Sequence, residues 1–358
     1  MKRYNFFGLS NNIFISEPFA FQIKTDLIRL GPIASQENYF FENYNQIKQK
    51  NYNQILQIFS KQIKSYISKF SIKNNLDTLK EIALAINSAE IELELIKDYK
   101  LINSYDEIQE PVIKIASVKN IKIKNNLKIP KVVDQLANEK ISAKEAIKEL
   151  QEKQFDNYYL TKAFSIGAFG IQKKIVPTKW SITAIDVIMS NYLLEKVKEY
   201  PSIDSFMLFY NSMLHNSFFI ILLPGNFEFE LFEITMKLNN FKYQIDNFTY
   251  DHEYYEGKKD YSIQAGGYYA VRLAISEYLE KIKKQAKVIA LRFIYPEYQK
   301  SLGVWNVREN VRDAMNKKSI ILNSKDEMLS YLEKQVKDLF SILKKKSVIL
   351  TQKRLTDF

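Results

Sequence analysis

The residues from Lys173 to Asp186, which read KKIVPTKWSITAID, bring together side chains that could bind a polar ligand. A cation, a flat aromatic face, two hydroxyls and a carboxylate fall within eight residues: Lys179, Trp180, Ser181, Thr183 and Asp186. Because proline lacks an N–H and disfavours helix before it, Pro177 predicts a helix that begins after it, capped by Ser181 or Thr183. The alternative is a tight turn into a helix with a buried tryptophan, and the pattern alone favours this alternative.

A second stretch combines paired glycines with an arginine. Gly266 and Gly267 precede a predicted helix that carries Tyr268 and Arg272. Glycines at the start of a helix expose backbone N–H groups that suit an anion such as phosphate. The pattern is neither a P-loop nor a dinucleotide fingerprint, since it lacks the other glycines and the lysine. The alternative is close packing of the helix start against a strand.

A third stretch runs from Glu297 through Trp305 to a predicted helix with three charged residues, Arg308, Glu309 and Arg312. The two arginines are helical neighbours, so an anion should lie between them, either a carboxylate or a phosphate. The chain holds 45 lysines but only 7 arginines, which suggests that arginine is used where its planar fork is needed. We therefore predict that the three stretches border one cleft for a base and its phosphate. The alternative is that each stretch solves its own packing problem.

These three stretches resemble the signature blocks of the archaeal Nre family of DNA-repair proteins. The first is similar to the family's VPTRWSITAVDD, although its second acid is Val187 here. The resemblance covers most of the chain and implies a role in repair without naming a reaction. Family members often carry an N-terminal cysteine cluster, whereas this chain has no cysteine. A metal-dependent role of that cluster is therefore not carried over.

The last residues resemble the motif that binds the PCNA sliding clamp, which Nre proteins also carry at the C-terminus. The motif residues are Gln352, Leu355 and Phe358. A short helical turn would place the leucine and the phenylalanine on one side for an apolar pocket, while the glutamine reaches a polar pocket. The motif usually ends with two aromatic residues, and this chain has one. The resemblance implies PCNA as a partner, and the alternative is a frayed tail.

The charge of the chain favours a nucleic-acid partner. The net charge is +11, and residues 251–358 contribute +7 of it, with 21 basic against 14 acidic residues. A basic surface of this kind suits the phosphate backbone of DNA, although the lysine bias alone could produce it. Residues 112–131 hold six lysines and no acid. They could form a basic ribbon for nucleic acid, but we favour an edge strand that lysines protect against aggregation.

The predicted fold class is α+β, with a helix-rich N-terminal region, a mixed α/β C-terminal domain and a short flexible tail. The expected boundaries are 1–145, 146–345 and 346–358. Residues 1–35 are expected to be irregular, whereas periodic apolar residues predict helices at 45–70 and 326–345. Residues 206–223 contain a polar cluster and are predicted to form two strands instead of a membrane span. No signal peptide is recognisable, so we expect a cytoplasmic protein with no membrane partner.

The expected function is DNA-damage repair by a protein that binds DNA and is recruited to PCNA. Two alternatives remain open: a nucleotide-using or DNA-modifying enzyme with a site between the Trp180 and Trp305 blocks, and a non-catalytic clamp adaptor. The loop from Asp251 to Gly257 contains a histidine and acids, but a solvated acidic loop explains it better than a metal site. No nucleophile–base pair or nucleotide fingerprint is recognisable. Catalytic residues and cofactors are therefore unknown.

Overall fold

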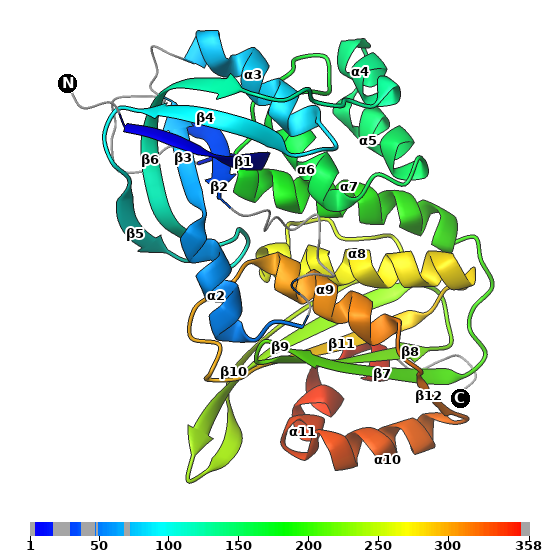
Figure 1. The fold of residues 1–358 in the computed structure, drawn as a ribbon. Coiled ribbons are helices and arrows are strands. Elements are labelled where there is room, and N and C mark those ends of the chain that lie inside the picture. Colours follow the sequence, from blue (N-terminus) through cyan, green and yellow to red (C-terminus); the bar gives the residue numbers. More distant parts are fainter. Residues whose placement is uncertain (1–3, 17–28, 37–46, 48, 68–71, 352–358) are drawn as a thin grey trace. The chain divides into compact units, whose positions relative to one another are not determined.

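The structure is a computed structural model that describes residues 4–16, 29–36, 47, 49–67 and 72–351 (Figure 1). The chain forms two compact units, Met1–Met189 and Ser190–Phe358. This division lies later in the chain than the boundary expected near residue 145. Each unit has its own six-stranded sheet, and we describe the units separately.

Unit 1 is built on a closed β-barrel. Its strands are β1 (Tyr4–Ile15), β2 (Leu30–Ser35), β3 (Ile63–Ile67), β4 (Ala89–Leu95), β5 (Lys100–Ser104) and β6 (Val112–Ile123). The order is β3-β2-β1-β4-β6-β5, and a parallel pairing of β3 with β6 closes five of the strands into a ring. A bulge between Leu9 and Asn12 lets β1 pair first with β4 and then with β2. This strand order, with a helix between the third and fourth strands of the ring, is that of the OB-fold.

The prediction of a helix-rich N-terminal region is wrong, because this region begins with strands. Residues 4–15 and 30–35, which were expected to be irregular, form β1 and β2. The expected helix at 45–70 is only partly present: Asn51 caps α2 (Tyr52–Lys61) with a capping box, and β3 follows at once. The helical spacing of apolar residues continues through β3. Periodicity alone therefore did not reveal that these residues form a strand of the barrel.

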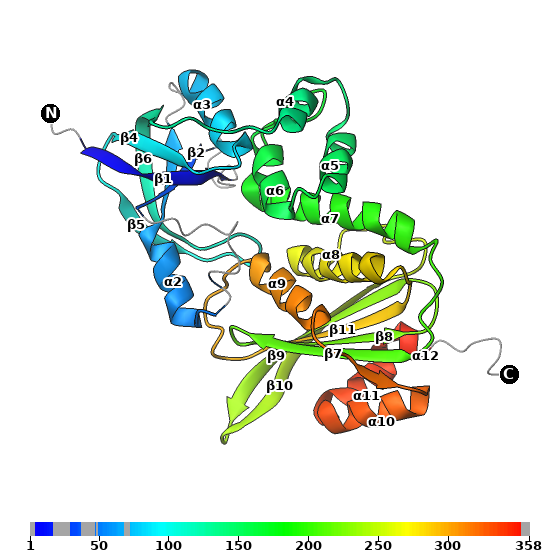
Figure 2. The same ribbon diagram turned by 45° about the vertical axis from the view of Figure 1, so that its right-hand side comes forward.

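Of the other helices of unit 1, α3 (Ile72–Leu84) lies between β3 and β4. The strands are followed by α4 (Lys131–Asn138), α5 (Ala143–Glu152), α6 (Asn157–Ser165) and α7 (Thr178–Val197), of which the last continues into unit 2 (Figure 2). The capping box predicted at Ser142 and Glu145 is confirmed at the start of α5. From α6, the buried Lys162 donates to the carbonyls of Asn11 at 2.9 Å and Ala85 at 3.0 Å. This cation therefore ties α6 to the β1 bulge and to the end of α3.

The lysine-rich strand β6 lies inside the sheet, so the interpretation of residues 112–131 as a protected edge is wrong. It pairs with β3 on one side and with β4 and β5 on the other. Its outward lysines meet acids of β4, with Lys119–Glu94 at 3.0 Å and Lys124–Glu92 at 2.7 Å. A hollow of about 270 Å³ lies among these mixed charges. The basic ribbon is therefore partly neutralised by its neighbouring strand.

Unit 2 is a three-layer α/β/α sandwich, which agrees with the mixed architecture expected for the C-terminal part. Its strands are β7 (Phe206–Met213), β8 (Asn216–Leu223), β9 (Glu228–Asn239), β10 (Lys242–Glu253), β11 (Lys287–Ile294) and β12 (Ile320–Leu322). The order is β10-β9-β11-β8-β7-β12. One face is covered by α8 (Ala265–Ile282) and α9 (Val304–Met315), and the other by α10 (Lys325–Gln335), α11 (Lys337–Lys346) and α12 (Val348–Thr351) (Figure 1). The inner strands β8 and β11 are almost continuously apolar because both faces are covered.

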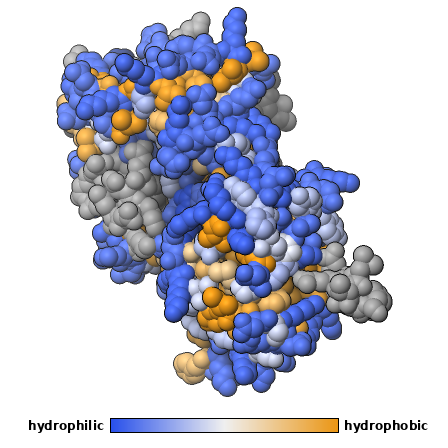
Figure 3. Space-filling view, turned by 90° about the vertical axis from the view of Figure 1, so that its right-hand side faces the viewer, coloured by the Kyte–Doolittle hydropathy of each residue, from blue (hydrophilic) through white to orange (hydrophobic). Residues whose placement is uncertain are grey.

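The two strands predicted within residues 206–223 are confirmed as the β7–β8 hairpin. Across the part of the chain that the structure describes, no helix is long and apolar enough to cross a membrane. The face shown in Figure 3 is mostly hydrophilic, and its hydrophobic residues form separate patches.

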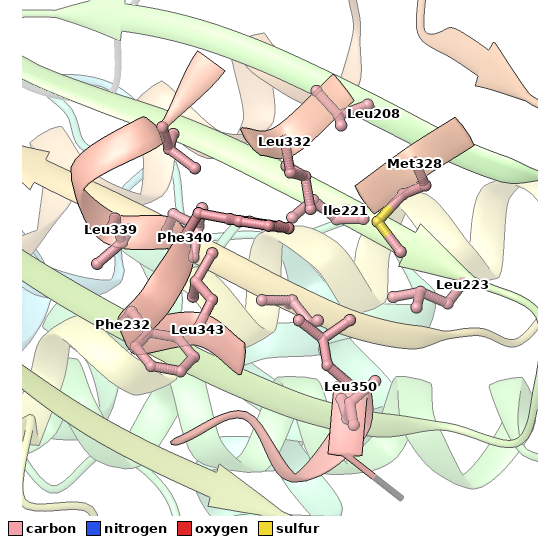
Figure 4. Packing of buried hydrophobic residues seen from close by; sticks show 14 of the residues in the cluster. Leu208, Ile221, Leu223, Phe232, Met328, Leu332, Leu339, Phe340, Leu343 and Leu350 are labelled. Atoms are coloured by element: carbon pink, nitrogen blue, oxygen red, sulfur yellow. The ribbon is translucent and has the colours of Figure 1, made fainter. Parts of the chain in front are cut away.

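The core beneath the sheet of unit 2 joins the strands to the C-terminal helices (Figure 4). The single helix expected at 326–345 is two helices, since Val336 leaves the helical conformation with φ −129° and ψ 44°. The apolar stripe predicted there is nevertheless core, with Met328, Leu332 and Leu343 fully buried. Ile349 and Leu350 also belong to this core, so this part of the predicted tail is packed against the sheet.

A buried carboxylate of β9 holds α12 in place. Glu230 accepts hydrogen bonds from the Ser347 hydroxyl at 2.6 Å, the Ile349 N–H at 2.8 Å and the Tyr250 hydroxyl at 3.1 Å. Burial raises the pKa of Glu230, although these hydrogen bonds oppose the shift. The folded protein therefore binds a proton at this site more readily than the unfolded chain does.

The raised pKa of Glu230 gives a pH-dependent contribution to stability. A raised folded-state pKa stabilises the protein below the unfolded value, and this stabilisation is lost as the pH rises through the folded value. We expect Glu230→Gln, which does not titrate, to lose less of its free energy of unfolding than the wild type between pH 4.5 and pH 7. Urea unfolding at several pH values measures the difference, and parallel curves for the two proteins would contradict it.

Candidate functional site

The first signature block begins α7 directly after Pro177, earlier than the predicted caps. The Thr178 hydroxyl accepts a hydrogen bond from the Ile15 N–H at 2.9 Å, which fixes the helix start to the end of β1. Ser181 and Thr183 lie inside the first turns of α7, so neither caps the helix. Proline suits the position before a first helical turn because its missing N–H has no helical partner to lose.

Lys179 and Trp180 are the two residues of this block that reach the surface. Trp180 is 59% exposed, which makes its ring available for stacking. Lys179 is partly exposed and its Nζ lies 2.9 Å from Asp106 Oδ2. Burial alone would raise the pKa of Asp106, but hydrogen bonds from Lys179 and from the Ile108 N–H lower it below its ordinary value. Asp106 is therefore a charged partner for Lys179.

The other polar residues of the block are buried. Ser181, Thr183 and Asp186 all lie inside unit 1, and the Ser181 hydroxyl is 3.4 Å from the Val176 carbonyl. The Thr183 hydroxyl has no hydrogen-bond partner among the described residues. The five residues that the sequence placed in one polar site are therefore three buried residues and two surface residues.

The paired glycines of the second block pack the start of α8 against the sheet. A Cβ on Gly267 would lie 2.9 Å from Glu233 Oε1 and 3.6 Å from Arg292 NH1. These two residues face each other on β9 and β11 and form an ion pair of 2.7 Å. Arg292 also donates to Asn216 Oδ1 at 3.0 Å. The carboxylate found close to this helix start is thus the protein's own, which supports the packing alternative for Gly267.

Arg272 of the same block has its fork occupied inside unit 2. It donates to Glu253 Oε1 at 2.6 Å and to Ser190 Oγ and Asn191 Oδ1 at 2.7 Å each. The side chains of Arg272 and Glu253 are both almost completely buried. Next to them, burial raises the pKa of Tyr268, which stays protonated. Glu253 was assigned to a solvated acidic loop, and that interpretation is wrong for this residue.

The third block is also mostly internal. Trp305 is buried and donates from Nε1 to the Leu302 carbonyl at 2.6 Å, whereas Arg308 is 1% exposed. Arg312 binds Glu277 through two nitrogens, at 2.8 and 2.6 Å, and Glu309 Oε1 at 2.6 Å. The anion expected beside Arg312 is therefore a pair of carboxylates of the chain.

Glu297 is separate from these buried pairs and lies beside the β9–β10 hairpin. Its Oε1 accepts a hydrogen bond from the Tyr243 hydroxyl at 2.6 Å. This hydrogen bond lowers the pKa of Glu297. The pair is exposed, so Glu297 contributes to a surface.

The structure brings the second and third blocks together in unit 2, where α8 packs along α9. The first block up to Asp186 belongs to unit 1, and a cleft shared by all three blocks stays a prediction. Within the described ranges, no group of three or more histidine, cysteine, aspartate or glutamate residues could hold a metal. The sequence analysis missed the carboxylates that pair with the arginines, Glu233, Glu253 and Glu277. Only strand register and helix packing reveal these partners.

Substitution of Arg272 or Glu253, which form a buried pair, should destabilise unit 2. Arg272→Lys keeps the charge but loses the fork, so at least one of its three acceptors stays unpaired. We expect the free energy of unfolding to fall by about 2–3 kcal/mol, because a buried acceptor is left without its hydrogen bond. Arg312→Lys is the matched control, because its pair is partly exposed and should cost about 1 kcal/mol or less. Equal losses in chemical denaturation would contradict this assignment.

Comparison with known proteins identifies the family. The model described as "Archaeal Nre, N-terminal" matches residues 26–242, and "Archaeal Nre, C-terminal" matches residues 253–358. The "DNA repair protein NreA" of Archaeoglobus fulgidus is 35% identical over 268 residues, which are 74% of this chain and 68% of that protein. The NreA of Haloferax volcanii is 34% identical over 67% of this chain and 59% of its own length.

A third relative is the "DNA repair protein NreB" of Archaeoglobus fulgidus, 30% identical over 72% of this chain and 66% of that protein. No solved structure matches. The two family models together cover nearly the whole chain. The chain therefore belongs to the archaeal Nre family.

Proposed function

We propose that this protein acts in DNA repair, binds DNA mainly through its phosphates, and is recruited to the PCNA sliding clamp by Gln352, Leu355 and Phe358. The observation that carries the repair role is its similarity to three proteins named DNA repair proteins. The net charge of +11 supports a polyanionic partner. The clamp residues lie outside the described residues, so the sequence motif supports that part.

The barrel of unit 1 gives DNA binding a second line of support. OB-folds commonly bind oligonucleotides, although a fold alone does not fix a function. The signature arginines do not provide this support, because Arg272 and Arg312 are engaged by carboxylates and Arg308 is buried. Surface lysines therefore supply the positive charge in this proposal. The same burial gives no support to an enzyme site built on Trp305 and Arg308.

The structure suggests where the clamp-binding segment can be removed without damage to the fold. Ile349 and Leu350 are buried in the core of unit 2, and the Thr351 hydroxyl donates to the Ser347 carbonyl at 2.8 Å. Thr351 itself is exposed. A chain that ends at Thr351 therefore keeps every described contact of α12.

DNA binding should depend steeply on salt. If about four phosphates are contacted, the affinity for duplex DNA should fall roughly 100-fold between 50 and 200 mM salt through counterion release. Fluorescence anisotropy with a labelled duplex and the matching single strand measures both slopes. An affinity that does not change with salt, or no binding at 50 mM salt, would refute backbone-driven binding.

Clamp binding should require the last seven residues. We expect the chain that ends at Thr351 to lose binding to PCNA in a titration calorimetry experiment, because the two apolar anchors are gone. Phe358→Ala, which removes one anchor, should weaken binding strongly. The melting temperature should stay unchanged in both variants. Equal affinity of the truncated and full-length chains would show that the motif does not recruit the clamp.

A further inference from the structure

The hairpin formed by β9 and β10 extends beyond the sheet of unit 2. β9 pairs with β11 only as far as Thr235, whereas its pairing with β10 continues to Asn239 and Lys242. The last part is therefore a two-stranded ribbon with no further strand beside it, and Figures 1 and 2 show it projecting from the rest of the sheet.

The two faces of this ribbon differ in character. Leu238 and Tyr243 lie opposite each other on one face, and both are largely exposed. Lys237 and Lys242 belong to the other face by strand alternation. The ring of Tyr243 packs edge-on against Tyr295 with ring centroids 4.9 Å apart, and its hydroxyl binds Glu297. These contacts brace the ribbon against the body of unit 2.

Phe241 at the tip of the ribbon is unfavourable for folding in both its exposure and its backbone conformation. It is 99% exposed, so its side chain buries no surface. Asn240 and Phe241 have φ values of 47° and 60°, as in a type I′ turn, whose second position normally holds glycine. A bulky residue is strained in this left-handed region. Isolated exposed apolar residues are common on protein surfaces, but strain without burial points to a role for this side chain outside the fold.

We infer that the β9–β10 hairpin is a wedge that inserts Phe241 between stacked bases of DNA, an inference that rests on the DNA binding proposed above. DNA-bending proteins insert phenylalanine or leucine between base steps and unstack them. Two-stranded ribbons also enter the minor groove of duplex DNA, the side from which such wedges insert. Lys237 and Lys242 flank the tip and can meet the neighbouring phosphates. The exposed pair of Lys237 with Asp246 at 3.1 Å is weak enough to be exchanged for a phosphate contact.

The size and surroundings of the tip favour DNA over other occupants. A single ring flanked by asparagines and lysines matches one base step. A stable protein interface needs roughly 800 Å² from each partner, far more than Phe241 supplies even together with Leu238 and Tyr243. An amphipathic membrane anchor presents a broad apolar face, whereas the tip residues Asn239, Asn240 and Lys242 are polar.

The test separates unstacking from binding. A duplex that carries 2-aminopurine becomes fluorescent when this base is unstacked, and anisotropy of a labelled duplex gives the affinity. With the full chain, we expect wild-type protein to raise the fluorescence and Phe241→Ala to abolish the rise. The affinity should fall roughly 5- to 150-fold, the range for loss of one base-stacking aromatic ring. Ile321→Ala, which removes an exposed apolar side chain from β12 at the opposite edge of the same sheet, is the control and should behave as wild type.

A second variant checks the strain argument. Phe241→Gly removes the same ring but suits the turn, so its melting temperature should rise by about 2–4 °C while the fluorescence response is lost. Both Phe241→Ala and Phe241→Gly should thus fail to unstack the bases, whereas only Phe241→Gly should have a raised melting temperature.

Each outcome decides between the proposals. DNA binding by the wild type, with a fluorescence rise in both Phe241 variants as large as that of the wild type, would overturn the wedge and leave DNA binding intact. No DNA binding by the wild type would overturn both. Binding to anionic phospholipid vesicles that requires Phe241, without a change in DNA unstacking, would assign the tip to a membrane surface and overturn the wedge.

Discussion

The seating of α8 on the sheet of unit 2 depends on the ion pair between Glu233 and Arg292. Register places the two residues opposite each other on neighbouring parallel strands, where both are largely buried. Gly267 allows the helix start to descend onto this pair, since a side chain there would collide with the carboxylate. A negative charge near a helix N-terminus is also electrostatically favourable. The Glu233 carboxylate thus pairs with the Arg292 guanidinium and also interacts favourably with the N-terminus of α8.

The same principle explains why arginine is used in a chain that otherwise prefers lysine. Arg272 and Arg312 each make three hydrogen bonds to acceptors within unit 2. Lysine offers one nitrogen and could not satisfy such a spread of partners. In unit 2, the residues of the signature blocks therefore mainly hold α8 and α9 in place. Function has to be sought among exposed residues, of which Trp180 and Phe241 stand out.

Sequence reasoning worked where local chemistry decides structure. The capping box of α5, the strands β7 and β8 and the helix after the paired glycines could all be predicted, because their signals lie within a few residues. The barrel could not, because β1 contains a glycine and three asparagines and is a strand only through pairing with β2 and β4. The arginine fork was a correct signal for multiple acceptors. Its partners were not predictable, since Glu253 and Glu277 lie on other elements and become neighbours only in the fold.

The double pairing of β1 has a consequence for how fragments of this protein behave. β1 is the ring member that joins β2 to β4, whereas the N-terminal family match begins at residue 26, after this strand. A fragment trimmed to the matched region would keep β2 and β4 and lose the strand between them. Two rows of unpaired N–H and C=O groups would then be open to pairing with other chains, which is a route to aggregation. β1 (Tyr4–Ile15) thus closes the barrel between β2 and β4, although it lies outside the segment that family similarity marks.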